Sequence, residues 1–236
     1  MTTTIIGYPR IGSHRELKFA VQKYFKQQVS ARELAQTAAE LRKQNWDTIS
    51  KAGIDQLVSN DFSYYDTTLD TANLLNIVPK RYKELNLSPL DEYFAQARGY
   101  QGDKGDVTAL SMKKWFNTNY HYLVPEFEDD TDVKLVGTKI FDEYQEAKNQ
   151  GYQTRPVILG PYTLLRLGAF EGKKQATDFT QAVVNAYEAI FEKLAALGAD
   201  WIQLDEPQLV KDQSEADLEL FTDLYKPLLA LSLIHI

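Results

Sequence analysis

The sequence has 236 residues, 33 acidic and 26 basic, for a formal net charge of −7, and it contains no cysteine. Disulfide bonds and a cysteine-ligated zinc site are therefore excluded within this chain, and the negative charge argues against nucleic-acid binding. No apolar run approaches the roughly 20 residues of a membrane helix, and the N-terminus lacks signal-peptide features, so we expect a cytoplasmic protein with no membrane or nucleic-acid partner.

Short apolar and β-branched segments predict five strands. They are residues 3–6, 55–59, 120–124, 156–160 and 201–204. Helical patterns separate most of these segments. Helices are expected from near Ser13, from Ser30 to Gly53, in parts of 64–97, and over 141–149, 176–197 and 214–230. The glycine-rich residues 98–106 predict a loop.

Alternating strands and helices predict an α/β fold with a parallel sheet. The strand starts are about 36 to 65 residues apart, whereas a complete eight-stranded barrel typically needs about 250 residues in total. At this spacing eight units would need more than about 300 residues, so we expect part of a barrel with about five β/α units. A complete five-stranded open sheet is the alternative.

Residues 7–18, the basic turn, join the first predicted strand to the first predicted helix. Ser13 and Glu16 have the spacing of a capping box, which predicts a helix that starts at His14. This start would place Arg15 and Lys18 on one helix face beside free backbone N–H groups, as an anion site requires. The alternative is that both cations are solvated surface residues.

A second segment, residues 112–122, mixes basic, aromatic and amide side chains. Its aromatic rings could stack on a flat heterocycle, and its lysines and amides could bind the polar edges of that ring. The alternative is a strand with core aromatic residues and solvated lysines.

Carboxylates follow several predicted strands. Asp205 and Glu206 end the fifth strand, Asp61 follows the second and Glu126 the third. Glu126 and Glu206 could serve as the carboxylate pair of a barrel-type glycoside hydrolase, or the carboxylates could order neighbouring loops. The three histidines lack metal-ligand spacing, so we expect no metal site in this chain.

Several motifs together resemble the cobalamin-independent methionine synthase family. They are residues 4–12 with 15–18, residues 114–122, Gly160-Pro161-Tyr162-Thr163, and Gln203-Leu204-Asp205-Glu206-Pro207. The resemblance implies that residues 1–236 form the N-terminal (β/α)8 TIM-type barrel of a two-barrel enzyme, incomplete after about five units and without the C-terminal zinc barrel. Residues 231–236 do not look like the continuation of the family.

The resemblance also implies a function. The whole enzyme would be a methyltransferase that moves a methyl group from 5-methyltetrahydropteroyl-polyglutamate to homocysteine, giving methionine. Zinc in the absent barrel would activate the homocysteine thiol, without cobalamin. This chain would bind the folate polyglutamate but would not catalyse the transfer alone, and it would hold neither catalytic residues nor metal ligands. The implied binding residues are Arg15, Glu16, Leu17, Lys18 and Lys114, with Asn119 as a weaker candidate.

Overall fold

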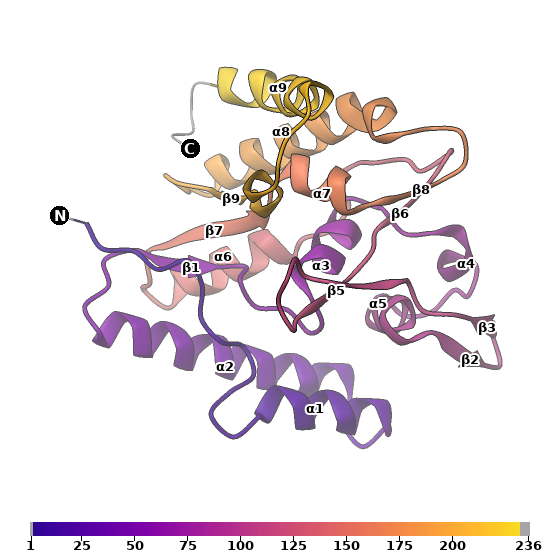
Figure 1. Cartoon of the computed structure of the whole chain (residues 1–236). Coiled ribbons are helices and arrows are strands. Elements are labelled where there is room, and N and C mark those ends of the chain that lie inside the picture. Colours follow the sequence, from indigo (N-terminus) through magenta and orange to yellow (C-terminus); the bar gives the residue numbers. More distant parts are fainter. Residues whose placement is uncertain (1, 232–236) are drawn as a thin grey trace. The chain divides into compact units, whose positions relative to one another are not determined.

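A computed structural model describes residues 2–231 (Figure 1). Its α-helices are α1 (Glu16–Phe25), α2 (Ala31–Lys51), α3 (Thr67–Leu74), α4 (Lys80–Lys83), α5 (Pro89–Arg98), α6 (Lys139–Asn149), α7 (Pro161–Leu167), α8 (Thr180–Ala196) and α9 (Glu215–Ala230), with 3₁₀ turns η1 (Ala176–Phe179) and η2 (Pro207–Val210). Its strands are β1 (Leu57–Ser59), β2 (Tyr100–Gly102), β3 (Gly105–Val107), β4 (Met112–Lys114), β5 (His121–Leu123), β6 (Glu126–Glu128), β7 (Thr154–Leu159), β8 (Ala169–Glu171) and β9 (Gln203–Asp205). Among residues 2–231, no helix is both long and apolar enough to cross a membrane.

The chain divides into two compact units. The first comprises Met1–Tyr64 with Lys139–Val157, and the second comprises Tyr65–Thr138 with Ile158–Ile236. The division falls within β7, whose first residues, to Val157, belong to the first unit and whose last two belong to the second, which also contains β9.

In the first unit, β1 runs parallel to β7, with Leu57 opposite Thr154. The predicted strand at residues 3–6 is reduced to one parallel bridge between Thr4 and Gln56. The capping box of Ser30 and Glu33 is confirmed at the start of α2. Trp46 on α2 packs with a buried cluster that includes β1 and α6 residues, and its indole N–H donates to the carbonyl of Val58 at 2.9 Å.

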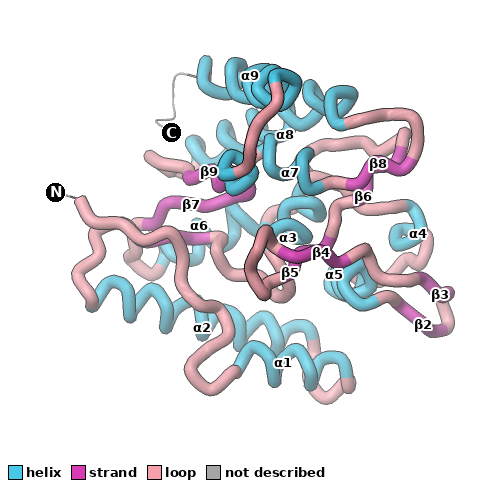
Figure 2. Tube along the Cα trace, in the orientation of Figure 1, coloured by secondary structure: helices cyan, strands magenta, loops and turns pink. Residues whose placement is uncertain are grey.

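In the second unit, α8 buries the apolar face that its spacing predicts, from Val183 through Leu194. Gly198 follows the helix with φ of 86°, as expected for a glycine stop. Two antiparallel hairpins, β2–β3 and β4–β5, and a parallel pair, β6–β8, complete its strands. Figure 2 shows how short these strands are beside the helices.

The α/β prediction is confirmed, but several details of the predicted parallel sheet are wrong. The predicted strand at 120–124 is β5, which pairs antiparallel with β4 because residues 115–120 turn the chain back. The loop predicted at 98–106 contains the β2–β3 hairpin, and α7 was not expected. The strands within residues 2–231 form four separate sheets and no closed barrel.

Candidate functional site

The basic turn, in the first unit, differs from its predicted capping geometry. Helix α1 begins at Glu16, and its N-cap is Arg15, which adopts a left-handed conformation with φ of 64° and makes no side-chain cap. The Glu16 carboxylate instead accepts the backbone N–H of His14 at 3.0 Å. The predicted Ser13–Glu16 capping box is therefore wrong, because the chain makes an extra turn before the helix.

That extra turn depends on Gly12, whose φ is 82°. A Cβ at this position would collide with the Glu16 carboxylate and lie 2.9 Å from Leu41 Cδ2. The carbonyls of Gly12 and Ile11 accept the backbone N–H groups of Arg15 and Leu17, each at 3.2 Å. The backbone of the turn is thus fixed by local bonds and by close approach to α2.

The side chains of the basic turn face different surroundings. Arg15 and Lys18 are exposed, whereas Leu17 is buried among Ala38, Leu41 and Phe62. Because Arg15 cannot accept a hydrogen bond, the first turn of α1 has no side-chain cap, although the Leu17 N–H already donates to the Ile11 carbonyl. The Leu17 side chain, by contrast, anchors the helix and does not reach the surface.

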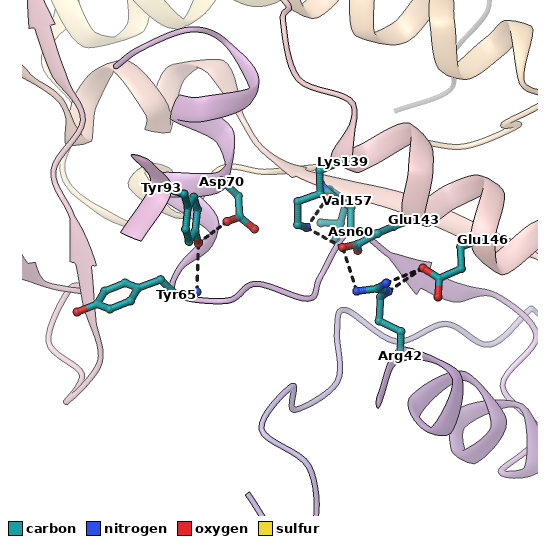
Figure 3. A network of polar contacts seen from close by, with 9 residues as sticks. All are labelled: Arg42, Asn60, Tyr65, Asp70, Tyr93, Lys139, Glu143, Glu146 and Val157. Carbon is teal, nitrogen blue, oxygen red and sulfur yellow. Dashed lines mark hydrogen bonds and ion pairs between the residues drawn. The ribbon is translucent and has the colours of Figure 1, made fainter. Parts of the chain in front are cut away.

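Asp61, which follows β1, holds the start of the basic turn. Its Oδ2 accepts the backbone N–H of Tyr8 at 2.9 Å. Burial raises the pKa of Asp61, while the positive charges of Lys139 and Arg42 oppose that rise. Figure 3 shows these two cations, each bound to a carboxylate of α6. Asp61 therefore orders a loop.

The segment around Lys114, in the second unit, forms the β4–β5 hairpin. Lys114 lies opposite His121 and is exposed. Between the strands, Phe116 has a left-handed backbone with φ of 53°, and its ring packs edge-on against Trp115, with 5.1 Å between centroids. Asn119 is exposed in the turn. The aromatic residues thus pack on one another within the hairpin.

The hairpin forms one wall of a pocket of about 620 Å³ in the second unit, here called the basic pocket. The second wall is formed by the end of α7, by η2, and by Lys211, which follows η2. The lining residues are Lys113, Lys114, Phe116, Asn117, Tyr122, Arg166, Leu167, Gln208, Val210 and Lys211. The lining contains four cations and no carboxylate, so it suits an anionic ligand. Asn119 is not among these residues, whereas Asn117 is.

Two carboxylates anchor the walls of the basic pocket. Asp66 caps α3 by accepting the backbone N–H of Leu69 at 2.9 Å, and it accepts the N–H of Leu123 on β5 at 3.1 Å. Burial raises the pKa of Asp66 to about 6. In the same unit, the Tyr93 hydroxyl donates to Asp70 at 2.7 Å, which ties α5 to α3 (Figure 3).

Glu206 is the second anchor. Its carboxylate accepts the backbone N–H groups of Tyr162 at 3.0 Å and Thr163 at 2.6 Å, and the hydroxyl of Tyr225 at 2.7 Å. Burial is the largest cause of its raised pKa, and these donors oppose the rise. Glu206 therefore caps α7 and orders the loop that leads into η2, which is the loop-ordering alternative from the sequence.

The hydrolase interpretation is not supported. Glu126 is bound by the Arg81 guanidinium at 2.6 Å, and Glu206 accepts three hydrogen bonds from Tyr162, Thr163 and Tyr225. Both carboxylates hold structural partners. Among residues 2–231, no three His, Asp or Glu side chains are grouped to hold a metal ion.

Of the other cations of the basic pocket, Lys113 belongs to the candidate segment 112–122 but is not among the predicted binding residues, and Arg166 and Lys211 were not predicted at all. Lys113 lies beside Lys114 in the sequence and could have been included with it. Arg166 and Lys211 come from separate segments, and no local pattern links them to Lys114. Only the paths of α7 and η2 bring them together.

Comparison with known proteins identifies the family of the chain. The family model described as the N-terminal domain of cobalamin-independent synthase matches residues 2–234. This match extends to residue 234, whereas each curated alignment covers 230 of the 236 residues, so the departure expected at residues 231–236 stays a prediction. Residues 232–236 lie outside the described structure.

Curated relatives named 5-methyltetrahydropteroyltriglutamate–homocysteine methyltransferase are 58% identical in Streptococcus suis and Streptococcus sanguinis and 56% identical in Streptococcus thermophilus. Each alignment covers 98% of this chain and 31% of the relative, so the chain spans about a third of their length. A crystal structure from Listeria monocytogenes, assigned as a vitamin-B12-independent methionine synthase, matches with a TM-score of 0.60 at 13% identity, over 96% of this chain and 62% of that one. At that identity the likeness concerns the fold alone.

Proposed function

The chain belongs to the family of cobalamin-independent synthase N-terminal domains, and from this premise we propose that it is the folate-polyglutamate-binding part of a methyltransferase. The whole enzyme would transfer a methyl group from 5-methyltetrahydropteroyl-polyglutamate to homocysteine, giving methionine. The observation that carries this proposal is the basic pocket, where four cations and no carboxylate line a space of about 620 Å³.

A polyglutamate tail suits such a pocket because each glutamate adds a carboxylate. A charge-assisted hydrogen bond to one carboxylate contributes roughly 1.5–3 kcal/mol when it is well formed. Lys114 is the residue that both the family resemblance and the pocket lining support. We propose that Asn119 contacts the ligand only at the edge of the basic pocket, because its side chain is exposed and does not line the pocket.

In the basic turn, Arg15 and Lys18 are proposed to bind carboxylates directly, because both are exposed at an uncapped helix start. Glu16 and Leu17 would act differently. The Glu16 carboxylate shapes the turn through the His14 N–H, and Leu17 is only 2% exposed. We therefore propose that these two residues position the cations.

The remaining parts of the proposal follow from the family. The chain would be part of an N-terminal (β/α)8 barrel in a cytoplasmic enzyme. A second barrel would bind homocysteine and zinc, and the zinc would lower the pKa of the homocysteine thiol. The chain alone has no cysteine to bind zinc as thiolate, so we expect it to bind folate without catalysing methyl transfer.

The proposal is tested by calorimetric titration of the 236-residue chain with 5-methyltetrahydropteroyl-triglutamate and with the monoglutamate. We expect the triglutamate to bind at least about tenfold more tightly, and we expect this advantage to shrink at high salt because counterions screen the lysines. Equal affinity for the two ligands, or an advantage insensitive to salt, would contradict the proposal.

A further inference from the structure

The second wall of the basic pocket contains cations that the family resemblance did not supply. Lys211 follows η2, and Arg166 lies in the last turn of α7. Arg166 pairs with Asp217 at 3.0 Å, so part of its charge is compensated. Among the described residues, Lys113, Lys114 and Lys211 form no ion pair. Three lysines with no carboxylate partner among the described residues therefore face one pocket.

Lys211 is held in a defined position. Its Nζ lies over the ring of Phe116, 5.1 Å from the centroid, in a cation–π arrangement. Phe116 is in the left-handed region, which is unfavourable for a residue with a side chain. Phe116 belongs to the hairpin wall and Lys211 to the second wall, so this contact joins the two walls of the pocket.

Gln208 provides an independent sign of a ligand. It lines the basic pocket and is 5% exposed. Its backbone N–H donates to the Thr163 hydroxyl, and its carbonyl accepts from Gln213. Its side-chain amide, however, forms no hydrogen bond with any described residue. Although the residue as a whole is largely buried, its amide atoms are not among the fully buried ones, so the amide is accessible to a polar ligand group in the pocket.

The chemistry of this wall fits an extended chain of carboxylates and amides. The lysines match carboxylates, and the Gln208 amide can both donate to and accept from a peptide-like linkage. A volume of about 620 Å³ is within the usual range for small-molecule sites, which is enough for more than one carboxylate-bearing unit.

We propose that Lys211, with Gln208 and Arg166, binds the glutamates beyond the first and so determines the tail length that this domain prefers. The inference rests on the proposed function, and it adds residues and a specificity role to it. Lys114 would bind the portion of the tail common to all ligands, and Lys211 would contribute only when further carboxylates are present.

The test compares affinities for the 5-methyltetrahydropteroyl mono-, tri- and pentaglutamates in the 236-residue chain. We expect Lys211→Ala to weaken triglutamate binding about tenfold, the effect of losing one charge-assisted bond, and to change monoglutamate binding less than about twofold. Lys211→Arg should restore most of the loss. Lys226→Ala is the matched control, because Lys226 is an exposed lysine of the same unit outside the pocket.

Three other outcomes would contradict either this inference or the proposed function. If Lys211→Ala weakens all three ligands equally, or none, the length-selecting role is wrong while the proposed function stands. If inorganic pyrophosphate displaces the triglutamate from the wild-type chain at equal concentration, the wall is a general anion site and the inference is also wrong. If the wild-type chain itself does not prefer the triglutamate, the proposed function fails. Thermal melts of Lys211→Ala and the milder Lys211→Gln verify that folding is unchanged, as expected for an exposed side chain.

Discussion

The basic turn and the basic pocket both gather cations, but they are built differently. The cations of the turn are neighbours in sequence, and they are presented by one helix that an apolar side chain, Leu17, anchors. The cations of the pocket come from three segments, and the partly buried carboxylates of Asp66 and Glu206 fix the walls that carry them. A site built from one segment can therefore be recognised from the sequence. A site built from several segments depends on residues outside it that hold those segments together.

The largest expected effect comes from the apolar anchor of the basic turn. Leu17→Ala should lower the free energy of unfolding by about 2–5 kcal/mol, because it leaves a cavity among Ala38, Leu41 and Phe62. Denaturant unfolding measures this change, and Leu17→Met, which conserves volume, is the control. A stable Leu17→Ala variant that only lost folate affinity would mean that the side chain contacts ligand instead.

The next effect concerns the carboxylate anchor of the hairpin wall. Asp66 has a folded pKa of about 6, raised by burial above its ordinary value of 3.8. The folded state therefore binds this proton more tightly than the unfolded state, so ionised Asp66 opposes folding above pH 6 and this penalty is relieved as the pH falls towards 4. The shift corresponds to at most about 3 kcal/mol.

Asp66→Asn isolates this contribution, because the amide does not titrate. Unfolding free energies of the wild type and the variant should be measured from pH 7 to pH 4. We expect the wild type to gain stability relative to Asp66→Asn as the solution is acidified. A constant difference across that range would show that Asp66 titrates normally.

A smaller effect is expected at the anchor of the other wall. Glu206→Gln turns one acceptor into an amide donor that faces a backbone N–H of α7, which should cost about 1–3 kcal/mol. It should also weaken triglutamate binding, because α7 and η2 carry the second wall of the pocket. Glu219→Gln, at an exposed position on α9, is the matched control for both measurements. Unchanged stability in Glu206→Gln would remove Glu206 as an anchor.

The smallest effect is expected at the exposed cations of the basic turn. Lys18→Ala should weaken triglutamate binding by about three- to tenfold at low salt and less at high salt, since an exposed charge is screened. Lys23→Ala, which removes an exposed lysine later in the same helix, should leave the affinity unchanged. Equal effects of the two variants would mean that the turn attracts the ligand only through general charge.

Much of the fold could be predicted from local patterns. The Ser30 capping box, the apolar face of α8 and the apolar strand β7 all have periodic or cap signals that act within a few residues. The β4–β5 pairing could not be predicted, because it depends on how the Phe116 turn reverses the chain. The start of α1 was also missed, since Gly12 creates a turn that overrides the Ser13–Glu16 spacing.

Part of the candidate site could be predicted from the sequence, and part could not. Arg15, Lys18 and Lys114 stand out by charge and family motif, and all three are exposed in the structure. For Glu206 the sequence offered loop ordering as one of two alternatives, and it gave no sign that the carboxylate caps α7. No local sequence pattern marks Lys211 as a site residue. The residues that it meets in the pocket from other segments, Arg166 and Phe116, are 45 and 95 residues away in the sequence.

The most direct test of the central claim is lysine side-chain NMR on the 236-residue chain, with resonances assigned through single lysine variants. On addition of 5-methyltetrahydropteroyl-triglutamate, we expect the resonances of Lys113, Lys114 and Lys211 to shift, while those of Lys226 and Lys104 stay unchanged. Shifts absent from the three pocket lysines, or spread evenly over all exposed lysines, would contradict this claim.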